Sequence, residues 1–218
     1  MPLSSPWLRP VAACFVAVNV AAESTCPPEG FETVEKFDAD GFFKSRWFVQ
    51  QQMEVGYFGA DVFRNMYTLM SSTYSPWPRD AALYLYSEQV TAPHVVKDAL
   101  MCLTVVDRQR GKMSVGPCGL PPGFDAPFWV LAQDEKEGYA LVSSGAPEVS
   151  DVGGCRVGDG TNAMGLWILT REQFRQQELV DKVRHIAADK GFDLSVLQDV
   201  EQVGRLASGR QGVEKVIG

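Results

Sequence analysis

The sequence predicts an all-β protein, an eight-stranded antiparallel up-and-down barrel followed by one C-terminal α-helix. Eight short runs of strand-forming residues lie between turns that are rich in glycine, proline and aspartate. The run 82–90 alternates strictly, with Tyr84 and Tyr86 on one face and Leu83 and Leu85 on the other. Strands in this order, joined by hairpin-length turns, exclude a doubly wound α/β fold.

The stretch 165–191 joins the last expected strand to the helix. It opens with the apolar run LWIL, and apolar residues then recur at helical spacing from 179 to 187, with charges between them. Gly191 supplies a helix stop, where a left-handed residue is usually needed. Arg171 therefore lies at the junction between strand and helix.

The other elements follow from the same patterns. A short helical turn over 37–43 is expected to plug one end of the barrel, and 196–203 to pair as a short ninth strand at the barrel edge. The eight barrel strands are expected at 46–53, 64–73, 82–90, 99–106, 111–115, 127–133, 139–143 and 164–169. The sixth and seventh are apolar on both faces, which indicates one face inside the barrel and the other under the helix.

Two segments far apart in the sequence resemble the two ends of the lipocalin family. FDADGFFKSRW, ending at Trp47, is similar to the family's opening, although Ser45 stands where a glycine is usual, and GLWILTR, ending at Arg171, is similar to its last strand. The resemblance covers residues 34–203, although the family's middle turn motif is not found in this sequence. The end of this region is most similar to the bacterial and plastid branch of the family, of the apolipoprotein D type. It implies that Trp47 closes the barrel floor and that Arg171 stacks on its ring, a favourable contact for a guanidinium.

The chain divides into four expected segments. Residues 1–22 read as a removed signal or targeting segment, because an apolar run too short to span a bilayer follows Arg9; a buried helix or an N-terminal anchor is the alternative. Residues 23–33 form a polar lead-in, 34–203 the lipocalin domain and 204–218 a flexible tail. A signal predicts an extracytoplasmic location on the secretory pathway or, alternatively, the plastid or thylakoid lumen.

The cysteines agree with export. Cys14 would leave with the signal, and an even set of four in a secreted chain reads as two disulfides, for which three pairings are possible. We favour Cys118–Cys155 and Cys26–Cys102, because Cys118 and Cys155 both lie in glycine- and proline-rich turns that bracket the same strands. The two histidines stand far from any cysteine cluster, so no metal site is expected.

Charge and motifs limit the function. The net charge of −7 argues against nucleic acid and anionic membrane surfaces as partners. No nucleophile triad, phosphate loop or metalloprotease motif occurs. We therefore predict a non-enzymatic lipocalin-like protein that binds or transports a small hydrophobic ligand, such as a lipid, carotenoid or other pigment, with no further cofactor.

The expected ligand-binding residues come from strand parity and from the loop after the first strand. Parity with Trp47 directs alternate residues of the first strand inward, and a slip of one residue would invert each set. The glutamines at 50–52 indicate either a partly polar pocket wall or a hydrogen-bonded barrel interior. The expected contacts are Val49, Gln51, Met53, Tyr57, Phe58, Met66, Met70, Trp129, Leu131, Tyr139 and Leu141.

Two alternatives remain. The first is an enzyme, because the barrel is distantly similar to that of xanthophyll de-epoxidases, where an acid near the mouth could protonate an epoxide. Asp61 is the catalytic candidate, although the flanking domains of those enzymes are not found in this sequence. The second is an accessory subunit associated with a membrane or a photosynthetic membrane complex, with the aromatic residues Tyr57, Phe58, Tyr74 and Trp77 as contacts.

Overall fold

The barrel is closed and antiparallel. The computed structural model describes residues 25–53, 63–73, 78–90, 96–158 and 165–204. Its barrel strands are β1 (Trp47–Met53), β2 (Phe63–Ser71), β3 (Ala81–Gln89), β4 (Val96–Asp107), β5 (Lys112–Pro117), β6 (Ala126–Asp134), β7 (Tyr139–Ser143) and β10 (Leu166–Thr170). Each pairs with the next, and β10 pairs back onto β1 to close the ring. The predicted fold class is confirmed.

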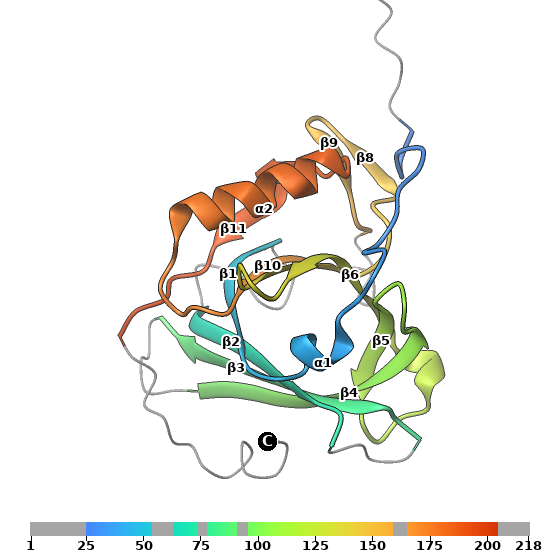
Figure 1. Cartoon of the computed structure of the whole chain (residues 1–218), viewed down its shortest axis with the longest axis vertical. Helices are drawn as coiled ribbons and strands as arrows, with labels where there is room; N and C mark the ends of the chain where they lie inside the picture. Colours follow the sequence, from blue (N-terminus) through green and yellow to red (C-terminus); the bar gives the residue numbers. More distant parts are fainter. Residues whose placement is uncertain (1–24, 54–62, 74–77, 91–95, 159–164, 205–218) are drawn as a thin grey trace, which may run out of the picture.

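One helix follows the barrel and covers part of its outside. Helix α2 (Gln177–Asp189) buries Val180, Val183 and Ala187 and lies along one side of the barrel (Figure 1). Val183 and Ala187 pack in one cluster with Leu131 of β6 and Leu141 of β7. The doubly apolar strands therefore do have one face inside the barrel and the other under the helix. The helix ends where expected, since Gly191 has a φ of +83°.

The smaller elements lie at the barrel ends and beside the helix. Helix α1 (Ala39–Phe42) is the expected plug, and Asp38 caps it by accepting a hydrogen bond from the Gly41 amide at 2.9 Å. The remaining elements are β8 (Val149–Asp151), β9 (Gly154–Arg156), β11 (Leu197–Asp199) and the 3-10 turns Pro122–Phe124 and Leu194–Val196. The β8–β9 hairpin lies between the predicted seventh and eighth barrel strands, where no strand is expected from the sequence.

The segment after the helix lies between β1 and β2. These two strands pair directly only at Trp47 and Phe48. Beyond that point β11 pairs with β1, and Gln202 Nε2 donates to the carbonyls of Val49 and Met66 at 2.8 and 2.9 Å, one on each strand. The predicted ninth strand therefore exists, but it fills a seam in the barrel wall.

Both predicted disulfide pairings are corrected. The structure joins Cys26 to Cys155 and Cys102 to Cys118. The first ties the lead-in to the β8–β9 hairpin beside the end of α2, and the second ties β4 to the turn after β5. Cys102 lies opposite Gly116 in the β4–β5 ladder, so Cys118 comes within reach of it through the local turn. No helix within the described ranges has the length and apolar character needed to cross a bilayer.

Candidate functional site: the barrel cavity and its floor

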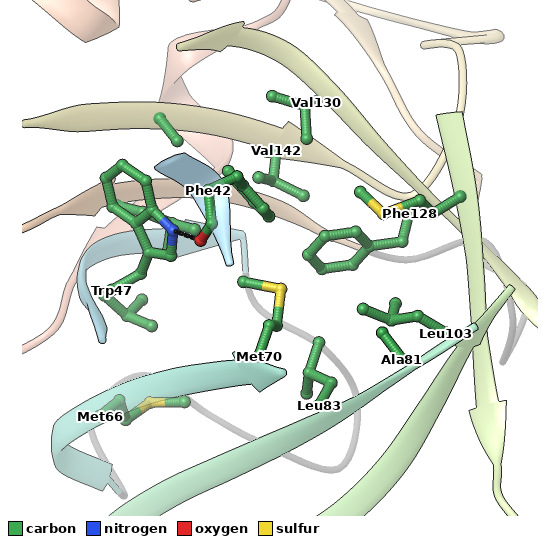
Figure 2. Packing of buried hydrophobic residues seen from close by; sticks show 14 of the residues in the cluster. Phe42, Trp47, Met66, Met70, Ala81, Leu83, Leu103, Phe128, Val130 and Val142 are labelled. Carbon is green, nitrogen blue, oxygen red and sulfur yellow. Dashed lines mark hydrogen bonds between the residues drawn. The ribbon is translucent and has the colours of Figure 1, made fainter. Parts of the chain in front are cut away.

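One end of the barrel is closed by an aromatic and cationic stack. Trp47 is fully buried, and its Nε1 donates a hydrogen bond to the carbonyl of Phe42 at 2.9 Å (Figure 2). The guanidinium carbon of Arg171 lies 3.4 Å from the centre of the Trp47 ring. This contact is the one that the family resemblance implies, and it joins the first strand to the residue after the last.

Arg171 also binds the backbone that passes beneath the barrel. Its guanidinium donates to the carbonyls of Ser45 and Gly41, each at 2.6 Å, and pairs with Glu135 at 3.0 Å. Burial lowers the pKa of Arg171, and the hydrogen bond and charge of Glu135 oppose that shift. Because a planar fork of donors can serve several carbonyls at once, arginine is suited to hold this crossing.

The half of the barrel next to the floor is filled by side chains. Phe42 and Trp47 meet with ring centroids 5.4 Å apart, and Met70, Leu103 and Val130 are almost completely buried against them. Figure 2 shows these side chains converging between the strands. This half is a packed core rather than a ligand pocket.

The other half holds a cavity of about 330 Å³. That volume lies at the lower end of the range for ligand pockets, about 300–1,000 Å³. Its lining is contributed by all eight barrel strands, the 3-10 turn before β6 and the residue after β7: Val49, Gln52, Met66, Thr68, Leu83, Leu85, Ala99, Met101, Val115, Gly116, Pro117, Phe124, Ala126, Pro127, Phe128, Val142, Ser144, Trp167 and Leu169. Among these lining residues none is charged. The cavity therefore suits an uncharged apolar body.

A buried ion pair fixes part of the rim. The Arg79 side chain is fully buried and pairs with Asp125, and it also donates to the carbonyl of Leu120 at 2.8 Å. The Cys102–Cys118 disulfide anchors the start of the same turn. Phe124, which is 62% exposed, is held at the cavity edge by this clamp. This side of the rim is therefore cross-linked by both an ion pair and a disulfide.

A bulge in β1 corrects two of the expected wall residues. The register with β10 shifts between Val49 and Gln51, so the alternation of faces is reset there. Gln51 faces outward, where it donates to Asp199 at 2.6 Å and accepts from Arg184 at 2.8 Å, and Met53 joins the cluster under α2. Gln52 takes the inward position instead.

The four expected wall residues of β6 and β7 are also corrected. Trp129, Leu131, Tyr139 and Leu141 lie on the outer face, in or against the cluster that includes α2. Other residues of the two strands face inward, among them the cavity residues Phe128 and Val142. Both faces of these strands are apolar, so the sequence pattern carries no signal to choose between them.

The remaining expected contacts divide into three groups. Val49 and Met66 line the cavity, and Met70 points inward but belongs to the packed half. Tyr57 and Phe58, together with the catalytic candidate Asp61, lie outside the described residues. The binding roles of all these residues stay predictions.

Three further residues that line the cavity were not predicted from the sequence: Leu83, Leu85 and Trp167. Leu83 and Leu85 share a face in the alternating run, but nothing in that run distinguishes inside from outside. Trp167 lies in an apolar run that reads equally well on either face. Within the described residues no group of three or more histidine, cysteine or acidic side chains could hold a metal ion.

The structure resembles solved lipocalins. Insecticyanin from the tobacco hornworm is 14% identical, with a TM-score of 0.55 over 82% of this chain and 86% of that one. Lobster apocrustacyanin A1 is 12% identical (TM-score 0.54, 77% and 81%), and lipocalin 12 from rat epididymis is 15% identical (TM-score 0.55, 85% and 97%).

No protein-family model matches the sequence, and no curated protein matches it either. At these low identities the structural similarities establish the fold alone. The chain has the lipocalin fold: a closed eight-stranded antiparallel barrel with one helix after it.

Proposed function

We propose that this protein binds and carries a small hydrophobic molecule in the mouth half of its barrel. The observation that carries the proposal is the cavity of about 330 Å³, whose lining is predominantly apolar. Removing apolar ligand surface from water contributes roughly 25 cal/mol per Å², so a snug cavity provides affinity without any catalytic group. The closed floor makes the mouth the route of entry.

A filled-cavity variant tests the proposal. Ala126 lines the cavity near its rim, so Ala126→Trp would place an indole in the ligand's volume. The uncharged dye N-phenyl-1-naphthylamine, followed by its fluorescence, should bind the wild type and lose about tenfold or more in affinity in the variant.

The matched control adds the same indole outside the barrel. Val106 is 69% exposed and does not line the cavity, so Val106→Trp should bind the dye as the wild type does. Equal affinity in Ala126→Trp and Val106→Trp, or no binding by the wild type, would contradict the proposal.

We further infer a lipocalin of the bacterial and plastid branch, with a lipid, carotenoid or other pigment as ligand and no catalytic activity. The resemblance of 37–47 and 165–171 to that family and the lipocalin fold support this assignment. A ligand larger than the cavity would have to project through the mouth. A carrier of this kind could deliver its ligand to a membrane or a membrane complex through peripheral contact.

The location we propose is extracytoplasmic, either secreted or in a plastid or thylakoid lumen. Two disulfides among the described residues support an oxidising compartment. An expression experiment in which residues 1–22 are removed in transit, with both disulfides formed, would support the assignment.

A further inference from the structure

Two buried polar groups in the cavity wall lack partners. Gln52 is 1% exposed and Thr68 is 9% exposed, and both line the cavity. Within the described part of the chain, Gln52 Nε2 and Thr68 Oγ1 have no hydrogen-bond partner. The third polar lining residue, Ser144, already has a partner, because its hydroxyl lies 3.3 Å from the carbonyl of Gly165. A buried donor left unpaired costs free energy, so such groups call for an explanation.

The β1 bulge places Gln52 in this position. Gln50 and Gln51, the two preceding glutamines, turn outward and are hydrogen-bonded, Gln50 to Thr170 Oγ1 at 2.8 Å and Gln51 to Asp199 at 2.6 Å. Gln52 lies opposite Trp167 on β10, towards the mouth. Of the three amides, the one that faces the cavity is thus the one whose NH₂ group is unpaired.

Thr68 occupies a lower position on the neighbouring strand. It lies opposite Trp47 on β1 and Leu85 on β3, so its hydroxyl is beside the floor. Gln52 is five residues further along β1, and the two groups therefore mark the top and bottom of one wall of the cavity.

The absence of charge among the lining residues defines the ligand further. The guanidinium groups near this part of β1 are engaged outside the barrel, where Arg184 donates to Gln51 and Arg175 pairs with Asp199 at 2.7 Å. A carboxylate ligand in the cavity would meet no cation among the described lining residues, and burying an unpaired charge is expensive. An uncharged oxygen meets no such penalty.

We propose that the ligand is an uncharged, oxygen-bearing hydrophobe, such as an alcohol, ketone or ester, anchored by Gln52 Nε2 near the mouth and by the Thr68 hydroxyl near the floor. This inference rests on the proposed carrier function. The amide NH₂ can only donate, so the ligand supplies an acceptor oxygen at the mouth end, whereas the threonine hydroxyl can donate or accept.

The test compares ligands of one chain length with and without charge. The probes are 1,12-dodecanediol, which carries a hydroxyl at each end, and dodecanoate at pH 8, each displacing N-phenyl-1-naphthylamine. The variants Gln52→Met and Thr68→Val keep the side-chain volume and remove the polar group. Each variant should weaken diol binding by about three- to tenfold, while the affinity for the dye stays unchanged or rises.

Each outcome decides the matter. Preference of the wild type for the diol over dodecanoate, lost for the diol alone in both variants, supports the inference. If dye binding is normal but the variants leave diol affinity unchanged, or dodecanoate binds more tightly than the diol, the anchor is disproved and the carrier function stands. If the wild type binds neither dye nor diol, both proposals fail. Thermal unfolding without ligand checks folding, because removing an unpaired buried group should not lower the melting temperature.

Discussion

The floor and the mouth half of this barrel are built from the same strands in opposite ways. At the floor, the Trp47 indole and the Arg171 guanidinium are hydrogen-bonded to backbone carbonyls, and close-packed side chains fill the space. In the cavity above the floor, Gln52 Nε2 near the mouth and Thr68 Oγ1 near the floor have no partners among the described residues. The floor is therefore stabilised by paired polar groups and close packing, whereas the cavity wall carries unpaired polar groups that cost stability.

The largest difference in stability is expected between two variants that each lose an aromatic side chain, one at the floor and one at the rim. Trp47→Ala should lower the free energy of unfolding by about 3–5 kcal/mol, because it opens a cavity in the packed half. Phe124→Ala, at the exposed rim, should change it by less than about 0.5 kcal/mol and weaken dye binding instead. Chemical denaturation and dye titration of both variants measure the contrast. Comparable losses of stability in the two would remove the distinction between the ends.

An isosteric pair sharpens the comparison at the level of single hydrogen bonds. The Thr170 hydroxyl is buried, accepts from Gln50 Nε2 at 2.8 Å and donates to the carbonyl of Glu172 at 2.7 Å. Thr170→Val should therefore cost about 1–2 kcal/mol, since it removes both hydrogen bonds of a buried hydroxyl. Thr68→Val makes the same chemical change in the cavity and should cost nothing or stabilise the protein. The free energies of unfolding of the two variants, measured by chemical denaturation, test this difference. Equal losses in the two variants would show that Thr68 is as well paired as Thr170.

The smallest effect separates stability from binding by their pH dependence. The Asp193 carboxylate accepts a hydrogen bond from the Ser195 amide at 2.8 Å and another from Gly153 at 3.3 Å, and these bonds lower its pKa below the ordinary 3.8. A lowered folded-state pKa contributes stability that is fully present above about pH 4 and is lost as the pH falls through the folded-state value.

The wild type should therefore have a larger free energy of unfolding than Asp193→Asn at pH 7, and this advantage should shrink below pH 4. The affinity for an uncharged ligand should stay constant from pH 5 to 9, because no charged residue is among the lining residues. Melting temperatures and dye titrations across this range measure both. An affinity that titrates near neutral pH would mean that a charged group reaches the cavity.

Much of this architecture can be predicted from the sequence. Alternation and turn residues locate the barrel strands, helical spacing and Gly191 locate α2, and two short motifs place Trp47 and Arg171 together across 124 residues of chain. The strands and the helix are local features of the sequence. The contact between Trp47 and Arg171 is implied by two short segments that resemble the lipocalin family. Net charge and cysteine number are likewise independent of how the chain is folded.

Tertiary structure decides which face of each strand meets the cavity. Apolar side chains on both faces of β6 and β7 satisfy the core and the underside of α2 equally well, so only packing tells Phe128 from Trp129. The bulge at Gln50 cannot be predicted from the alternation of apolar and polar residues, yet it turns Gln51 outward and Gln52 inward. Disulfide pairing depends in the same way on which turns the folded barrel brings together.

The sequence by itself therefore determined the class of fold and its order of elements, because periodicity and residue chemistry act over short stretches, and the resemblance of two short segments to the lipocalin family implied the closed floor. Only the tertiary structure decided the seam filled by β11, the joining of Cys26 to Cys155 and of Cys102 to Cys118, and the two unpaired polar groups in the cavity. Each of these depends on register and on distances between segments far apart in the chain. A shift of a single residue, which no periodic pattern detects in a doubly apolar strand, exchanges the inside of the barrel for the outside.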